Sequence, residues 1–206
     1  FKMINNDLLY YIPSGEFGKE GVLGLLKTHP EIRFVSLVGI DLAGNDTDEK
    51  VPIELFLKNY DDFFAGTAVQ TDGSSVVLMN IATLNDARVD MVADASVNWY
   101  IDYNEDNLYS NGRPVGTLRI PCFLLHNGKF IDSRSILKES CAFVAEKLKG
   151  LLASGKPVKG MEDLPVDEIE DIKFTIGTEL EFWVKTPSET ETVQHLSISQ
   201  RLQEQY

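Results

Sequence analysis

Apolar residues recur at helical spacing in several stretches of the chain. Residues 19–28 carry an apolar stripe, which His29-Pro30 ends, and residues 52–64 carry a second stripe with Pro52 near its start. The longest amphipathic stretch covers residues 133–152. The spacing predicts three helices, and a fourth helical pattern begins at residues 193–206.

Other stretches alternate or run continuously in apolar character, as β-strands do. The segment 33–41 predicts a buried strand, and Asn127-Gly128 predicts a tight hairpin turn after a second strong strand at 116–125. A polar loop is expected at residues 102–113. Further strands are expected at residues 50–53, 76–81, 97–101 and 171–184.

Glycine and proline divide the chain late in its length. Gly155, Pro157 and Gly160 lie close together, with Pro165 following, which is typical of a linker. We therefore expect an N-terminal lead, a first domain, a linker and the start of a second domain. Their expected bounds are residues 1–17, 18–153, 154–170 and 171–206.

Composition narrows the classes of function. The formal net charge of −13 disfavours binding to phosphate backbones, so we expect no nucleic-acid partner. No apolar run is long enough for a membrane span, and no secretory leader is visible, so we expect a cytoplasmic protein. The two cysteines, Cys122 and Cys141, have no metal-site spacing and are expected to be buried hydrophobes.

Two glutamates, Glu179 and Glu181, are candidate metal ligands. On a β-strand, residues two apart point to the same face, about 7 Å apart. Neighbouring carboxylates repel each other unless cations such as Mg²⁺ or Mn²⁺ neutralise them. The simpler interpretation of this pattern alone is a half-exposed strand with two solvated glutamates.

A polar turn, Thr71-Asp72-Gly73-Ser74-Ser75, is the second candidate. Its Asp72 could bind a cation or accept a proton, and Asp90 could face the same opening. Asp-Gly and serine are also ordinary turn formers. The three histidines have no metal-site spacing, and the chain contains no nucleotide-binding glycine motif and no nucleophile elbow.

In their order, these pieces resemble the glutamine synthetase family. The family's Asp-Gly-Ser-Ser loop matches Asp72 to Ser75, its Ser-Asp-Met with a following Pro-Asp matches the stretch from Val89 to Asp94, and its Glu-Xaa-Glu-Phe strand matches Glu179 to Phe182. The resemblance covers about residues 18 to 185. It implies an α+β chain, with a β-grasp N-terminal domain followed by the first strand and helix of a truncated α/β catalytic domain.

The same resemblance implies an ATP-dependent ligase that joins ammonia to glutamate through γ-glutamyl phosphate. Glu179 and Glu181 would each hold one of two divalent metals, Mg²⁺ or Mn²⁺, and ATP would be a substrate. Asp72 would bind ammonium across a subunit interface in a homo-oligomeric ring, with Asp90 supporting that edge. Nucleotide- and glutamate-binding residues of the family match nothing here, so we expect a fragment that is inactive on its own.

The chain also departs from the family pattern. The segment between Asp72 and Asp90 is longer, Val76-Val77 replace an expected glycine, and Ala93 replaces a proline. Two alternatives therefore stay open. One is a related γ-glutamyl ligase that uses an organic amine, and the other is a non-catalytic β-grasp module for assembly.

Overall fold

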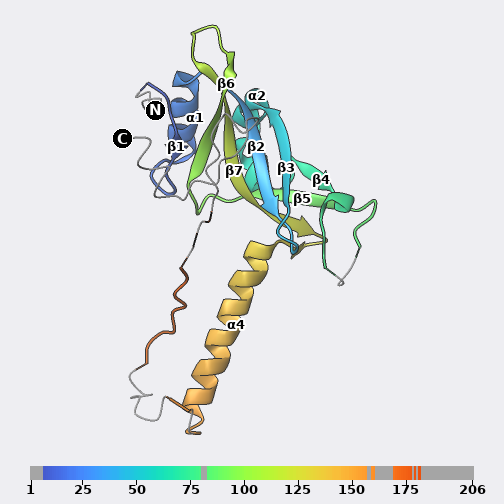
Figure 1. Cartoon of the computed structure of the whole chain (residues 1–206), viewed down its shortest axis with the longest axis vertical. Helices are drawn as coiled ribbons and strands as arrows, with labels where there is room; N and C mark the ends of the chain where they lie inside the picture. The colour runs from blue at the N-terminus through green and yellow to red at the C-terminus, as the bar shows by residue number, and fades with distance from the viewer. Residues whose placement is uncertain are drawn as a thin grey trace, which may run out of the picture. The chain divides into compact units, whose positions relative to one another are not determined.

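The computed structural model describes residues 7–79, 83–156, 159–160, 169–177, 179 and 181. The chain divides into two compact units, Phe1–Glu170 and Asp171–Tyr206. All helices and strands of the described residues belong to the first unit (Figure 1). None of these helices is long and apolar enough to cross a membrane.

The first unit is a mixed sheet with helices, an α+β architecture. The longest strand, β7 (Pro114–His126), lies parallel to β2 (Ile32–Ile40), and every other strand pair is antiparallel. The remaining strands are β1 (Tyr11–Ile12), β3 (Asp46–Pro52), β4 (Gln70–Asp72), β5 (Arg88–Ala93), β6 (Trp99–Leu108) and β8 (Lys129–Phe130). The helices are α1 (Lys19–Thr28), α2 (Ile53–Lys58), α3 (Tyr60–Ala65) and α4 (Ser133–Ala153).

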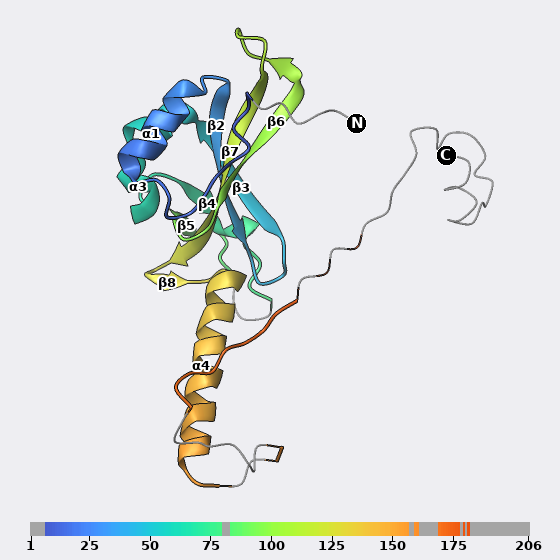
Figure 2. The same ribbon diagram turned by 90° about the vertical axis from the view of Figure 1, so that its left-hand side faces the viewer.

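Strand β7 is the central strand of the sheet. Its first half lies between β6 and β2 in the order β1-β6-β7-β2-β3, and its second half pairs with β5 and β8. Strand β4 extends the sheet beyond β5. A hairpin, helices and a returning central strand parallel to the first give a β-grasp-like arrangement, which Figure 2 shows from the side.

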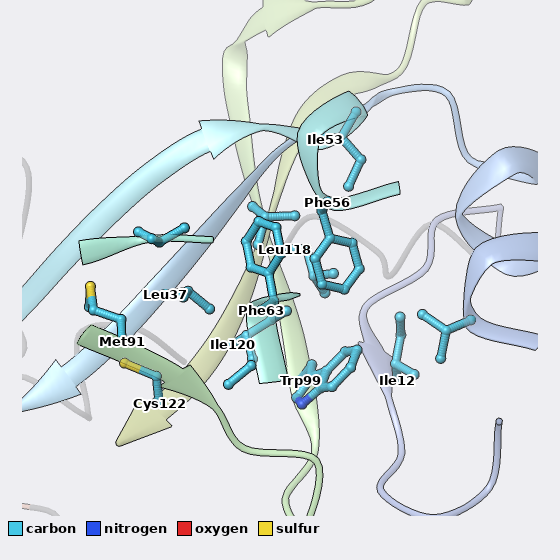
Figure 3. Close-up of a cluster of buried hydrophobic side chains, with 14 of the residues drawn as sticks. Ile12, Leu37, Ile53, Phe56, Phe63, Met91, Trp99, Leu118, Ile120 and Cys122 are labelled. Carbon is cyan, nitrogen blue, oxygen red and sulfur yellow. The ribbon is translucent and has the colours of Figure 1, made fainter. Parts of the chain in front are cut away.

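The core lies on the side of the sheet that α2 and α3 cover (Figure 3). Phe56 and Phe63 are fully buried, and their rings meet edge to face at 5.0 Å between centroids. Phe56 also meets Trp99 at 6.2 Å. Such edge-to-face pairs add stability beyond the burial of their area. Aromatic packing therefore joins α2, α3 and β6.

Helix α4 begins at a fully satisfied cap. The Asp132 carboxylate accepts the Ser135 backbone N–H at 2.8 Å and the Leu124 backbone N–H at 3.1 Å. Arg134 donates a hydrogen bond to Asp94, which is 3% exposed, at the end of β5. These contacts fix the first turn of α4 to β5 and β7. Further along the helix, apolar side chains are exposed at Leu137, Phe143, Val144 and Leu151.

Several predictions from periodicity are confirmed. The helix expected at residues 19–28 is α1, and the one expected at 133–152 is α4. The Asn-Gly turn is formed, with φ of 50° at Asn127 and 73° at Gly128. Two positive φ values are what a tight hairpin of this kind requires.

Other predictions need correction. The helix expected at residues 52–64 is broken at Asn59 into α2 and α3. The polar loop expected at 102–113 is mostly strand, because β6 runs to Leu108 and pairs with the start of β7. The expected lead contains β1, whose Ile12 is 3% exposed in the core.

Two expected strands are absent from the described residues. Residues 76–79 form no extended strand: Leu78 makes an isolated bridge, and the Val77 backbone N–H is hydrogen-bonded to the side chain of Asp41. In the second unit, residues 171–177, 179 and 181 carry neither strand nor helix. A strand is stable only when a neighbour takes its backbone hydrogen bonds, and no described residue of this unit does so. Residues 193–206 lie outside the described residues.

Candidate functional site

The loop that follows β4 is held in one conformation by its packing. A Cβ atom at Gly73 would lie only 2.1 Å from the carbonyl oxygen of Leu84, so glycine is required there. The Gly73 N–H donates to the carbonyl of Ala87 at 2.7 Å. The backbone therefore turns sharply at Gly73, directly after Asp72.

Asp72 stands at the start of this turn with its side chain exposed. Its carboxylate accepts the backbone N–H of Ser74 at 2.7 Å and caps the single 3₁₀ turn η1 (Gly73–Ser75). Hydrogen bonds from Ser74 lower the pKa of Asp72. Asp72 is thus a solvent-facing carboxylate that stays ionised at neutral pH.

Asp90 lies on the same face as Asp72. Strands β4 and β5 pair with Gln70 opposite Asp90 and with Asp72 opposite Arg88. Residues that face each other across a ladder share one face of the sheet, and diagonal neighbours lie about 7–8 Å apart. The structure therefore brings the two predicted aspartates together as diagonal neighbours.

Arg88 lies on the same face, opposite Asp72 on the neighbouring strand. Its Nε atom lies 3.0 Å from a carboxylate oxygen of Asp90, and both side chains are partly exposed. The face thus carries two negative charges and one positive charge. Arg88 is not among the residues that the sequence pattern predicts for the site; its place on this face follows from its position on β5, two residues before Asp90.

His126 lies beside β5, the strand that pairs with β4. Its Nδ1 atom is 2.9 Å from the carbonyl oxygen of Arg88, and its Nε2 atom is 2.8 Å from the side-chain nitrogen of Asn127. A proton on Nδ1 satisfies both contacts, because Nε2 then accepts from the amide. The histidine at the end of β7 is therefore hydrogen-bonded to the backbone of β5.

A pocket of about 490 Å³ opens next to the loop. It is lined by Gly73 and Ser74 and by the segments 76–79 and 83–85. Val77 and Met79 are exposed at its rim, at 43% and 56%. The lining is mainly apolar, with Ser74, Thr83 and Asn85 as its polar members, and Asp72, Asp90 and Arg88 are not part of it.

The remaining predicted residues, Glu179 and Glu181, lie in the second unit. Both are exposed, and neither belongs to a strand. Carboxylates are the right donors for Mg²⁺ or Mn²⁺. Within the described residues, however, no group of three or more potential metal ligands gathers in one place.

Comparison with known proteins gives similarity to solved structures only. The sequence matches no known family model and no curated protein. Among solved structures, it is similar to a cryo-EM structure of Plasmodium falciparum glutamine synthetase, with a TM-score of 0.44 and 18% identity. The match covers 65% of this chain and 24% of that chain, so the chain spans about a quarter of that enzyme's length.

Proposed function

We propose that this chain is the N-terminal part of an ATP-dependent ligase of the glutamine synthetase type. The reaction would join ammonia to glutamate through γ-glutamyl phosphate. Asp72 and Asp90 would form the ammonium-binding edge of the site, and ATP and glutamate would be the other substrates. In a homo-oligomeric ring, this edge would serve the active site of a neighbouring subunit.

The observation that carries the proposal is the placement of Asp72 and Asp90 on one face of β4 and β5, at a loop that Gly73 holds in place. A preorganised anion binds a cation without first paying to reorganise its surroundings. The loop is therefore suited to hold NH₄⁺ in a fixed position. The family motifs quoted above supply the second support.

The two aspartates would have different roles in binding ammonium. Asp72 has a lowered pKa, so its carboxylate is better at holding the cation than at keeping a proton. Asp72 would orient NH₄⁺ and accept one of its protons, which then passes to solvent. The resulting NH₃ would attack the acyl carbon of γ-glutamyl phosphate and displace inorganic phosphate, and the second proton lost from the new amide nitrogen would also pass to solvent. Asp90, paired with Arg88, would support this edge.

Glu179 and Glu181 would each contribute to one of two divalent-metal sites, with Mg²⁺ or Mn²⁺ bound. Their oxygen donors fit these hard cations, and the other ligands would come from residues beyond these two. The metals would neutralise the phosphate charge during phosphoryl transfer. In this proposal both glutamates are ligands only and transfer no protons.

The test is ATP-dependent γ-glutamyl transfer by the full-length gene product that carries this chain. Ammonia and several organic amines are compared at equal concentration, with phosphate release and amide product both measured. We expect preference for ammonia, dependence on Mg²⁺ or Mn²⁺, and loss of turnover in the variants Glu179→Ala and Glu181→Ala.

Asp72 is tested in the same assay. Asp72→Asn should raise the KM for ammonia strongly, while the KM values for ATP and glutamate stay unchanged. Asp46→Asn, an exposed aspartate at the start of β3, is the matched control and should behave like the unaltered protein. Preference for an organic amine would identify a sister ligase, and no turnover with any amine would favour a non-catalytic assembly module.

A further inference from the structure

We propose that Asp41 is a positioning residue for the loop that carries Asp72; the catalytic part of this inference rests on the function proposed above. Asp41 directly follows β2 and is 1% exposed. It lies 36 residues before Val77, yet its carboxylate accepts the backbone N–H of Val77 at 2.9 Å. One buried side chain therefore connects the β2–β3 turn to the far end of the candidate loop.

The two oxygens of Asp41 have separate tasks. Oδ1 accepts the backbone N–H groups of Ala43 at 2.8 Å and Asn45 at 2.9 Å, and so closes its own turn. Oδ2 accepts the Val77 backbone N–H and the Asn45 side-chain amide, the latter at 3.1 Å. Only Oδ2 contacts the loop. We call its hydrogen bond from the Val77 backbone N–H the tether, and variants can separate this contact from the hydrogen bonds that close the turn.

The tether replaces the backbone hydrogen bond that a strand would supply at this point. Val76 and Leu78, on either side of Val77, are 5% and 8% exposed and pack in the core. Val77 itself is 43% exposed, and its backbone N–H, which lies between these two buried side chains, donates to Asp41.

The carboxylate is held in its charged form. Burial alone would raise the pKa of Asp41, but the hydrogen bonds from Val77, Asn45 and Ala43 outweigh it and lower the pKa. Hydrogen bonds to an ionised acceptor are about twice as strong as neutral ones. The tether is thus a charge-assisted contact at neutral pH.

The tether reaches Asp72 through a short run of backbone contacts. The Val76 N–H donates to the Gly73 carbonyl at 3.1 Å, and the Gly73 N–H donates to Ala87 at 2.7 Å. At the other end, the hydroxyls of Thr71 and Thr47 are hydrogen-bonded at 3.3 Å. The loop is therefore fixed on both sides of Asp72, and Asp41 fixes the side that follows it.

The experiment uses Asp41→Asn in the 206-residue chain. The amide keeps one oxygen for the turn and turns its NH₂ group toward Val77, where two donors then face each other. Amide hydrogen exchange at Val77 should become about 10- to 100-fold faster, the range for losing a hydrogen bond to a charged group. Exchange at Leu118, in the central strand, is the internal reference and should stay unchanged.

Two further variants separate the tether from the turn. In the double variant Asp41→Asn with Asn45→Asp, the side-chain pair between these residues is restored in reversed polarity, while Val77 still lacks its acceptor. Val77 exchange should stay fast in this double variant. Asn45→Ala removes only the side-chain amide contact, so Val77 exchange should match that of the unaltered chain. Unchanged exchange at Val77 in both Asp41 variants would overturn the proposal.

The full-length protein supplies the catalytic readout. Asp41→Asn should raise the KM for ammonia about tenfold or more while leaving the KM for ATP unchanged, and it should add little in an Asp72→Asn background. A matching rise in both KM values would show a general structural defect and overturn the positioning role. Absence of any ligase activity would defeat the proposed function instead, and hydrogen exchange would then decide on the tether alone.

Discussion

The Nε atom of Arg88 lies 3.0 Å from the carboxylate of Asp90, and Arg88 also stands directly opposite Asp72 on the neighbouring strand. One arginine therefore neighbours both aspartates on this face, one along its own strand and one across the ladder. Together the three side chains carry a net charge of −1.

The first prediction concerns this balance of charge. Arg88→Met in the full-length protein should lower the KM for ammonia by up to about fivefold, because it removes a cation next to the site; exposed ion pairs contribute only about 0.2–1 kcal/mol. The effect should fade at high salt, since surface charges are screened. Steady-state kinetics at low and high ionic strength provide the measurement.

The control for Arg88 is Arg33→Met. Arg33 forms a comparable exposed ion pair with Glu54 at 2.7 Å, but it lies on β2, outside the candidate site. Its removal should leave the KM for ammonia unchanged. Equal effects of the two variants would point to the net charge of the protein rather than to the site.

A second prediction concerns Gly73. Gly73→Ala should destabilise the chain by about 1–3 kcal/mol, the usual cost of forcing extra atoms into a packed position. The new methyl group would collide with the backbone oxygen of Leu84, which cannot rotate away. Urea denaturation followed by tryptophan fluorescence gives the change in unfolding free energy.

Gly24→Ala is the matched substitution for Gly73. Gly24 lies inside α1, and a Cβ atom there would meet nothing within 4 Å. Alanine in a helix should stabilise the chain by about 0.5–1 kcal/mol relative to glycine. The two glycine variants should therefore shift stability in opposite directions, and a neutral Gly73→Ala would contradict the tight loop.

The third prediction is an acid dependence of stability. Glu31 is fully buried and is bonded to His29, Asn111 and Arg113. Burial would raise the pKa of Glu31, but hydrogen bonds from its own backbone and these partners outweigh it and lower the pKa. A depressed pKa in the folded state means that the ionised group stabilises the fold.

The sign of the effect follows directly. The contribution of Glu31 is fully present above the unfolded-state pKa of about 4.3 and is lost as the pH falls through the lower folded-state pKa. Glu31→Gln should therefore lower the unfolding free energy at pH 7 by about 1–3 kcal/mol. In this variant the unfolding free energy should also decrease less steeply as the pH is lowered. Glu54 belongs to an exposed ion pair, so Glu54→Gln should leave the pH dependence of the unfolding free energy unchanged. Parallel pH profiles for the unaltered chain and both variants would contradict the prediction.

The fourth prediction concerns the two cysteines. Burial raises the pKa of the Cys122 thiol to about 12, and the side chain is fully buried in β7. Cys141 is half-buried on α4. A thiol-specific disulfide reagent should label Cys141 alone in the native chain and both thiols after denaturation, because only an accessible thiolate reacts.

Cys141→Ser should abolish native labelling, and Cys122→Ser should leave it intact. Rapid labelling of Cys122 in the native chain would show that the core opens at β7. Counting labelled thiols by mass spectrometry before and after denaturation distinguishes these results.

The sequence was sufficient where structure depends on near neighbours. The 3.6-residue period of apolar positions placed α1 and α4, and the Asn127-Gly128 pair placed a hairpin turn. In each case the deciding interactions link residues two to four positions apart, and these are visible in the spacing itself. The pairing of Asp72 with the Gly73 turn was visible for the same reason.

Contacts between distant segments decided the rest. The polar residues after Asp102 form strand because β7 supplies their hydrogen-bond partners, and Tyr11-Ile12 join the sheet because β6 does. The spacing of residues along the chain does not show which strands will pair. Over residues 171–177, the described part of the strand expected at 171–184, no strand is formed.

The candidate site shows the same division. The sequence by itself identified Asp72, Asp90 and the glycine turn, because these lie within short patterns. Only the tertiary structure placed Arg88 opposite Asp72 and brought Asp41 to the backbone of Val77. Strand register and a buried hydrogen bond across 36 residues depend on how the whole sheet packs, and no local pattern encodes them.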